Sequence, residues 1–345
     1  MKITILGAGA WGSAMAIHLN RCGQRVTLVP RRVEHALEIA TRRENAVYLP
    51  RVSFPLDIQI ASNLAPALID CEVLIFACPS KALRETARRA KASLDAVQAR
   101  AAGGACAGGL RMAITLCKGV EAGTFLRPVE VLRQELVGVP AGTISGPTNA
   151  AEVAAGMPVA VVLACAGASP EICKKIQEEF SNDAFRVYLS GDVAGVELGG
   201  SLKNIYAIAS GICDGMKLGA NARASLITRS LAEMSRIAVA FGGNAETVRG
   251  LSGMGDLIAS ATADWSRNRS FGLLLGSAGL DVALGKMEAG ASVVEGYYAT
   301  KNFFEYVRNK GVSAPILECV HAIIYEKKSP QFAIAALMTR DLKAE

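Results

Sequence analysis

The chain has 345 residues, 51% of them hydrophobic and 20% charged, a balance typical of folded globular proteins rather than disordered ones. Its net charge of +6 is scattered without a dense basic run, and only 6% of its residues are aromatic. Both features argue against a nucleic-acid stacking surface, whereas a mild positive field suits small anionic ligands. We expect no membrane span, because no apolar run is long enough. The length exceeds that of one ordinary core, so we expect two domains.

The number and spacing of the cysteines indicate whether the protein works in a reducing or an oxidising compartment. Nine are present at irregular spacing, none in a Cys-x-x-Cys pair, and some lie inside apolar runs, as Cys165 does. An odd number of scattered thiols is typical of reduced cysteines in a cytoplasmic protein, not of disulfides or zinc ligands. With only three histidines and no metal motif, we expect no metal site.

The first half of the chain alternates short apolar runs with helical patterns. Helices are expected between the strands, for example at residues 10–22 and 170–180, and residues 101–109, rich in glycine and alanine, are interpreted as a surface loop. The expected strands are residues 2–6, 25–29, 57–61, 72–77, 112–116, 143–145, 158–164 and 185–189. This alternation predicts an α/β fold, a doubly wound and mostly parallel sheet of Rossmann type.

Helical periodicity dominates the second half. Asp192 is a candidate helix cap, and Leu198, Leu202 and Ile205 then recur at helical spacing. The predicted organisation is a Rossmann domain over residues 1–191, followed by an all-helical domain over residues 192–345.

A glycine-rich turn follows the first strand. Gly7, Gly9 and Gly12 enclose Ala10 and Trp11 in a G-x-G-x-x-G pattern that opens an amphipathic helix. In dinucleotide-binding proteins the first glycine allows a tight turn, the second lets the backbone approach the pyrophosphate, and the third lets helix and strand pack closely. The helix N-terminus then faces the diphosphate. The turn therefore predicts an NAD(P)-dependent dehydrogenase.

The end of the second strand bears on which dinucleotide binds. An NAD site usually offers an acidic residue there, but this chain has Pro30, Arg31 and Arg32, with Glu34 slightly later. Arginines suit a 2′-phosphate by charge and geometry. The sequence therefore favours NADPH over NADH. The alternative is that the two arginines are simply solvated and that the enzyme uses both cofactors.

Three further segments carry candidate chemistry. Lys118 follows a strand end, where ligands of doubly wound sheets bind, although an ordinary loop lysine is the alternative. Lys203 lies in a helix of small residues beside an apolar stripe, where desolvation would lower its pKa and suit it to proton transfer. Alternatively, its side chain reaches solvent. Residues 266–270 place Arg267 and Arg269 among hydroxyl and amide groups, as in a phosphate clamp or an ordinary polar turn.

Together these segments resemble the NAD(P)-dependent glycerol-3-phosphate dehydrogenases of bacteria, in order along nearly the whole chain. The most specific are the Leu-Gly-Gly-x-Leu-Lys-Asn run at 198–204 and Ser-Arg-Asn at 266–268. The other matching segments are residues 7–12, 48–50, 117–121, 145–148, 195–197, 219–223, 253–256 and 293–296.

The resemblance implies reversible reduction of dihydroxyacetone phosphate to sn-glycerol 3-phosphate, which supplies glycerophospholipid synthesis. Lys203 matches the proton-transfer residue, and Asp256 would either accept from a substrate hydroxyl or orient Lys203. The matching substrate positions are Lys118, Gly146, Thr148, Lys203, Asp256, Ser266, Arg267 and Asn268. The matching cofactor positions are Gly7, Gly9, Ala10, Trp11, Gly12, Arg31, Arg32, Lys118, Ala150, Arg267, Val293 and Glu295.

Two positions depart from the family pattern. Asn149 stands where phenylalanine is usual, which affects the packing beside Thr148, and Cys117 stands where serine or threonine is usual. Two other functions stay open: a different β-hydroxyacid-type dehydrogenase of the same architecture, and a non-catalytic NADP-binding sensor. The oligomeric state is open as well, with a homodimer as one option.

Overall fold

In the computed structural model, residues 1–100, 109–289 and 294–339 are described. The chain forms two compact units. Unit 1 comprises Met1–Lys118 and Leu126–Val193, and unit 2 comprises Gly119–Phe125 and the chain from Ala194 onward. The predicted boundary after residue 191 therefore omits one short segment that groups with the second unit. Most of the loop expected at 101–109 lies outside the described residues.

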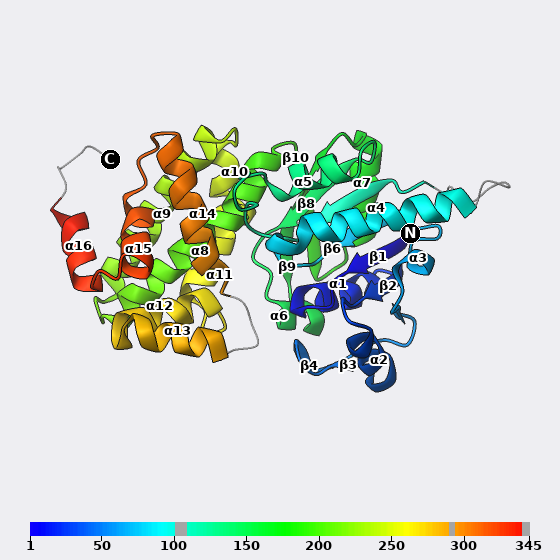
Figure 1. Cartoon of the computed structure of the whole chain (residues 1–345), viewed down its shortest axis with the longest axis horizontal. Coiled ribbons are helices and arrows are strands. Elements are labelled where there is room, and N and C mark those ends of the chain that lie inside the picture. Colours follow the sequence, from blue (N-terminus) through cyan, green and yellow to red (C-terminus); the bar gives the residue numbers. More distant parts are fainter. Residues whose placement is uncertain (101–108, 290–293, 340–345) are drawn as a thin grey trace. The chain divides into compact units, whose positions relative to one another are not determined.

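Unit 1 is built on an eight-stranded sheet with strand order β10-β9-β8-β7-β6-β1-β2-β5 (Figure 1). All neighbours pair in parallel except β8 and β9, which are antiparallel. The strands are β1 (Lys2–Leu6), β2 (Arg25–Val29), β5 (Gln59–Ile60), β6 (Val73–Phe76), β7 (Met112–Thr115), β8 (Ala141–Ser145), β9 (Val159–Ala166) and β10 (Phe185–Ser190). The mostly parallel sheet is confirmed, and each of the eight expected strands overlaps one of these.

One strand pair was missed by the sequence patterns. β3 (Glu44–Asn45) and β4 (Leu49–Ser53) form a separate antiparallel pair. β4 contains Pro50, and Arg51 has a φ of 65°. Such a short run, interrupted by proline and by left-handed backbone, lacks the alternation by which a strand is recognised.

Helices cover both faces of the eight-stranded sheet. The core on one face includes residues of α1, α2, α6 and α7, and that on the other includes residues of α4 and α5 with α3 packed against it (Figure 1). Their bounds are α1 (Ala10–Arg21), α2 (Val33–Arg42), α3 (Leu64–Ala67), η1 (Ser80–Ala82), α4 (Leu83–Arg100), α5 (Pro128–Glu135), α6 (Ala150–Ala155) and α7 (Pro170–Phe180). β1 lies between β2 and β6, so the strand order reverses at β1, the place where doubly wound sheets bind ligands.

Every regular element described after β10 is helical, as expected. α8 is the central helix of unit 2, since Ala194 to Cys213 are all buried. The elements are α8 (Val193–Gly215), α9 (Ala220–Ala240), α10 (Ala245–Arg249), the π-helical turn η2 (Leu251–Gly255), α11 (Asp256–Thr262), α12 (Arg267–Ala278), α13 (Leu280–Ala289), α14 (Glu295–Asn309), α15 (Pro315–Tyr325) and α16 (Pro330–Met338). No helix in the described ranges has both the length and the hydropathy that crossing a membrane requires.

The segment 119–125 packs into the core of unit 2. Val120 is buried in that core, and the ring of Phe125 stacks on Tyr306 with centroids 4.9 Å apart. The backbone N–H of Gly119 donates to the Ser201 hydroxyl on α8 at 2.7 Å. These contacts explain why the segment groups with unit 2 although it leaves the sheet directly after β7.

Candidate active site

The glycine turn of unit 1 has the geometry that a dinucleotide requires. Gly7 has a φ of 114°, and a Cβ there would lie 2.4 Å from the carbonyl oxygen of Ala77. A Cβ on Gly12 would lie 2.1 Å from the carbonyl oxygen of Gly7. A Cβ on Gly9 would meet nothing within 4 Å, so this backbone faces open space.

The helix that follows the turn offers its N-terminus to an anion. α1 begins at Ala10, and its N-cap residue Gly9 provides no side-chain hydrogen bond. The first turn carries no acidic residue, and Trp11 in that turn is half-buried. The N–H groups of this first turn therefore suit a diphosphate, and the residues present fit a dinucleotide.

Buried polar side chains support the turn from behind. The Asn45 amide donates to the Ala8 carbonyl oxygen and to the Ser13 hydroxyl, both at 2.8 Å. Its oxygen lies 3.1 Å from Nε2 of His35. Sequence reasoning missed these residues, because Asn45 lies in the unrecognised strand β3 and belongs to no motif.

Arg31 and Arg32 lie at the same edge of the sheet as the turn. β1 and β2 are parallel with Leu6 opposite Val29, and the N–H of Gly7 donates to the Val29 carbonyl at 3.0 Å. Both arginines follow β2 and are exposed, with Arg32 as the N-cap residue of α2. Two exposed guanidinium groups beside the dinucleotide turn fit a 2′-phosphate.

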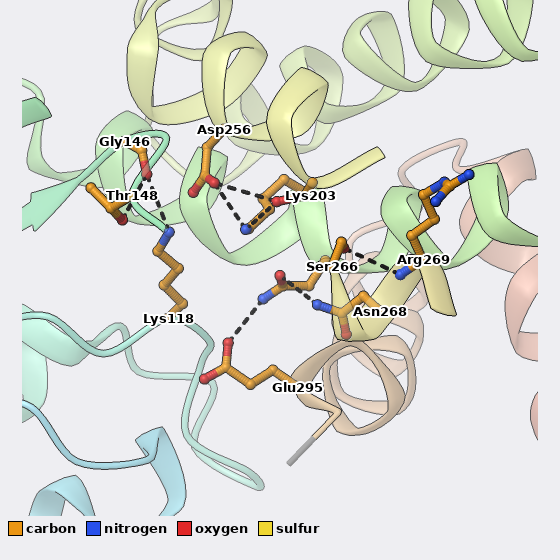
Figure 2. Close-up of polar contacts among 11 residues, drawn as sticks. Lys118, Gly146, Thr148, Lys203, Asp256, Ser266, Asn268, Arg269 and Glu295 are labelled. Carbon is orange, nitrogen blue, oxygen red and sulfur yellow. Dashed lines mark hydrogen bonds and ion pairs between the residues drawn. The ribbon is translucent and has the colours of Figure 1, made fainter. Parts of the chain in front are cut away.

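The ends of β7 and β8 bring together three of the expected substrate positions. Nζ of Lys118 lies 3.5 Å from the Gly146 carbonyl oxygen, and the Thr148 hydroxyl donates to the same oxygen at 3.2 Å (Figure 2). Gly146 has a φ of 151°, and a Cβ there would approach the Ala160 carbonyl to 3.0 Å. The glycine therefore lets the loop after β8 pass closely over β9.

Asn149, the departure from the family pattern, has a structural explanation. Its side-chain oxygen accepts from the N–H groups of Ala151 and Glu152 at 2.9 and 3.1 Å, which makes it the N-cap of α6. Ala150 is the first residue of that helix. Asparagine is among the best N-cap residues, so the departure supplies a cap and the Thr148 hydroxyl keeps its own contact.

In unit 2, Lys203 is buried in a polar environment. Its side chain is 10% exposed, and Nζ donates to Oδ1 of Asp256 at 2.9 Å and to the Ser260 hydroxyl at 2.6 Å (Figure 2). The alternative of a side chain reaching solvent is wrong. Two polar groups meet the amine, and one of them is Asp256, which was expected either to orient Lys203 or to accept from a substrate hydroxyl. Sequence reasoning missed Ser260, although it lies one helical turn after Asp256 on α11.

Small residues bring these groups together. A Cβ on Gly199 of α8 would lie 3.0 Å from Cα of Gly253 in η2, and a Cβ on Gly253 would lie 2.0 Å from the Val248 carbonyl oxygen. At Gly199 the absence of a side chain therefore lets η2 lie close against α8. Because α11 follows η2 directly, this contact places Asp256 beside α8. π-helical turns are frequent at functional sites.

A hydrogen-bond chain links three elements of unit 2. Asn204 accepts from the Asn268 amide at 2.9 Å and donates to Oε2 of Glu295 at 3.2 Å (Figure 2). The oxygen of Asn268 accepts from the N–H of Gly296 at 2.9 Å. Asn204, which the sequence analysis gave no role, thus orients an expected substrate residue and an expected cofactor residue. Its only sequence signal was its position directly after Lys203.

The residues of the expected phosphate clamp differ in their surroundings. Some make contacts within the protein, and one is exposed. The Ser266 hydroxyl accepts from the N–H of Arg269 at 3.3 Å and caps α12. The Arg269 guanidinium pairs with Asp214 and Asp264, with distances of 2.8 and 2.9 Å. Arg267, the first residue of α12, is exposed. The second arginine of the expected clamp therefore has a structural role, whereas Arg267 is exposed.

The expected site residues fall into two groups, one in each unit. Unit 1 holds the glycine turn, the arginine pair, Lys118, Gly146, Thr148 and Ala150, and unit 2 holds Lys203, Asp256, Ser266, Arg267, Asn268 and Glu295. Val293 lies outside the described residues.

Comparisons with known proteins agree with this organisation. Residues 2–171 match the NAD-dependent glycerol-3-phosphate dehydrogenase N-terminus, and residues 192–335 match the C-terminus of the same family. Curated proteins named glycerol-3-phosphate dehydrogenase (NAD(P)+) are similar over the whole chain. The one from Prosthecochloris aestuarii is 41% identical, covering 100% of both chains, and the one from a Thermoanaerobacter species is 40% identical, covering 100% of this chain and 99% of the relative.

A solved structure is similar as well. The crystal structure of glycerol-3-phosphate dehydrogenase from Coxiella burnetii superposes with a TM-score of 0.88 at 39% identity, over 98% of each chain. The match extends over both units, from the glycine turn to the helices that carry Lys203 and Arg267. The chain therefore belongs to the NAD-dependent glycerol-3-phosphate dehydrogenase family.

Proposed function

We propose that this protein catalyses the reversible reduction of dihydroxyacetone phosphate to sn-glycerol 3-phosphate with NAD(P)H. The observation that carries the proposal is the buried Lys203–Asp256–Ser260 cluster, in a chain that belongs to this family. When bound, the nicotinamide supplies a hydride to the carbonyl carbon of the substrate. The protein's task is then to hold the substrate and to provide the proton that its carbonyl oxygen gains.

Lys203 is the proton donor in this proposal. Its ammonium gives one proton to the substrate oxygen during reduction and regains one from solvent, and it accepts a proton in the reverse direction. Asp256 and Ser260 fix the direction of Nζ through their contacts of 2.9 and 2.6 Å. The Asp256 carboxylate is 1% exposed, so this orienting role is supported over that of a solvent-facing substrate ligand.

Phosphate recognition is assigned to the start of α12. Arg267 is exposed and can donate two parallel hydrogen bonds to phosphate oxygens. Asn268 is oriented by Asn204, and Ser266 keeps the first turn of α12 in place. Lys118, Gly146 and Thr148 are proposed as further substrate contacts.

The cofactor is assigned to the glycine turn. Gly7, Gly9, Ala10, Trp11 and Gly12 would hold the diphosphate, and Arg31 with Arg32 would hold a 2′-phosphate, which favours NADPH while NADH stays usable. Ala150, Val293 and Glu295 are proposed to contact the cofactor, as are Lys118 and Arg267.

A cytoplasmic location and homodimeric assembly are also proposed. The cytoplasmic location is supported by the cysteines of the described residues, all of which are free thiols. The homodimer is one option for an oligomeric state that the sequence leaves open.

The test is the initial rate of NADPH oxidation with dihydroxyacetone phosphate. We expect saturable turnover, and we expect Lys203→Ala to lower kcat by about 10² to 10⁴, the usual contribution of a positioned general acid. The matched control is Lys301→Ala, which removes an exposed lysine of the same unit and should leave the rate unchanged.

Two results would contradict the proposed activity, and a third would contradict the role given to Lys203. If the protein turns over unphosphorylated β-hydroxyacids but not dihydroxyacetone phosphate, it belongs to the other class of dehydrogenase. Tight NADPH binding with no turnover of either substrate would indicate a sensor. Full activity of Lys203→Ala would remove this lysine from the mechanism.

A further inference from the structure

Two cysteines follow the ends of neighbouring strands in unit 1. β6 and β7 pair in parallel with Phe76 opposite Thr115, and two residues further along each strand lie Cys78 and Cys117. Their Sγ atoms are 3.9 Å apart. Because adjacent strands lie roughly 5 Å apart, such a pair meets the Cα spacing of about 4.4–6.8 Å that disulfides have. The sulfur atoms must still approach each other by about 2 Å to bond.

The two thiols differ in reactivity. Cys78 is half-buried, and its contact with the Cys117 thiol lowers the pKa of Cys78. Cys117 is 7% exposed, and the contact with Cys78, followed by burial, raises the pKa of Cys117 well above its usual range. Cys78 is the more exposed of the two thiols, so it is the one placed to meet an oxidant, and Cys117 is the neighbour within reach to complete the reaction.

The pair adjoins the groups assigned to ligand binding. The carbonyl oxygen of Ala77, directly before Cys78, is the atom against which Gly7 packs. Lys118, directly after Cys117, contacts the Gly146 carbonyl. A bond between the sulfurs would close their distance from 3.9 Å to about 2.05 Å and shift both strand ends.

We propose that Cys78 and Cys117 form a peroxide-sensitive dithiol whose disulfide inactivates the dehydrogenase reversibly. The Cys78 thiolate attacks one oxygen of hydrogen peroxide, which breaks the O–O bond, gives a sulfenic acid and releases hydroxide. The Cys117 sulfur then forms the S–S bond, and the sulfenic oxygen leaves as water. Two thiols are oxidised, one peroxide is reduced to two waters, and a dithiol reductant reverses the change.

The test starts from the reduced, full-length protein exposed to hydrogen peroxide. Trypsin places Cys117 in peptide 112–118 and Cys78 in peptide 52–81, which also holds Cys71. We expect these two peptides to be linked, with the fragment spectrum assigning the bond to Cys78. The activity should fall about 10- to 100-fold, as for a catalytic group misplaced by about 1 Å, and dithiothreitol should restore it.

Matched variants separate this bond from general oxidation. Cys117→Ser carries the residue usual in the family and should keep its starting rate and resist peroxide, and Cys78→Ser should behave in the same way. Cys165→Ser removes another half-buried thiol of unit 1 and should remain as sensitive as the unaltered chain. Thermal unfolding of each variant checks that it is folded.

Three results would overturn the proposal: no link between Cys78 and Cys117, a link with no loss of rate, or a Cys117→Ser variant as sensitive as the unaltered chain. The rate measurement rests on the proposed function, but the peptide link does not. If the chain reduces no dihydroxyacetone phosphate, NADPH titration by fluorescence replaces the rate. Weaker NADPH binding by the linked form then supports the proposal, and equal binding overturns it.

Discussion

Arg31 and Arg32 are the side chains that we propose distinguish the two dinucleotides. Both are exposed beyond β2, where an acidic residue would instead meet the ribose hydroxyls of NAD. A hydrogen bond to a charged group contributes about 1.5–3 kcal/mol. If the proposal holds, the preference between the two cofactors depends on these two guanidinium groups at one edge of the sheet.

Replacing both arginines by alanine should lower kcat/KM for NADPH by about 10- to 100-fold. It should change the value for NADH little, because NADH has no 2′-phosphate. The measurement is a pair of initial-rate series with the two cofactors. Arg25→Ala, at the other end of β2, is the control and should alter neither series. An equal loss of kcat/KM with both cofactors would show that the two arginines do not recognise the 2′-phosphate.

At this scale the sequence predicted some features and not others. The glycine turn could be recognised from spacing alone, because each glycine has a local reason. The surroundings of Lys203 could be expected only in part, because the resemblance offered Asp256 as an orienting residue but gave no sign of Ser260. These residues lie 53 and 57 positions away and meet Lys203 only through tertiary packing. Asn149 was identified as a departure, but its capping role depends on where α6 begins.

At the scale of elements, unit 2 depends on helices whose backbones nearly touch. Gly272 of α12 faces α8, where a Cβ would lie 2.0 Å from the Ile208 carbonyl oxygen. Gly211 of α8 faces back, with a Cβ only 2.0 Å from the Arg269 carbonyl oxygen. This packing fixes α12, which begins with Arg267 and Asn268, against the helix that carries Lys203.

The change Gly272→Ala should therefore destabilise the protein by about 1–3 kcal/mol, as overpacking of a core does, because backbone must move to admit the methyl group. Chemical denaturation measures the loss. Gly285→Ala in α13 is the matched control, since a Cβ there would meet nothing within 4 Å. It should leave stability unchanged or raise it, as alanine favours a helix. A similar loss in both variants would refute the packing argument.

Elements with regular patterns were the predictable ones. The parallel strands are short, buried apolar runs, and α7 occupies the residues expected for it. The small residues at 199–201 indicate that something lies close to α8, but they do not identify the neighbour, which at Gly199 is η2.

At the scale of the whole molecule, acid stability depends in part on His18. Its ring stacks on Phe185 with centroids 3.9 Å apart, and Nε2 lies 2.8 Å from the Phe180 carbonyl oxygen. Burial lowers the pKa of His18 from 6.5 to about 4. A lowered pKa means that the folded state prefers the neutral ring, so this contribution is complete above pH 6.5 and is lost as the pH falls toward 4.

The unaltered chain should thus lose up to about 3 kcal/mol of unfolding free energy across that pH interval through this one group. His18→Gln keeps a donor for the Phe180 carbonyl but does not titrate, so its stability should fall less steeply with acid. Denaturation curves at several pH values measure the two slopes. Parallel slopes would exclude His18 as the source.

The two-part organisation was visible as a change of periodicity, but the membership of residues 119–125 was not. These seven residues, in the loop between β7 and α5, offer no helical or strand pattern of their own. Their place is decided by Val120 and Phe125, which pack among helices far later in the chain.

This segment has a consequence for exchanging parts between relatives. A chimaera that joins the first 192 residues of this chain to the remainder of a relative would keep the native Val120 and Phe125 among foreign partners. The core of its second unit would then contain two side chains from a different protein than the helices around them. A chimaera that also takes residues 119–125 from that relative would have a second unit from one source. The part of this protein that can be exchanged as a module is therefore discontinuous in sequence.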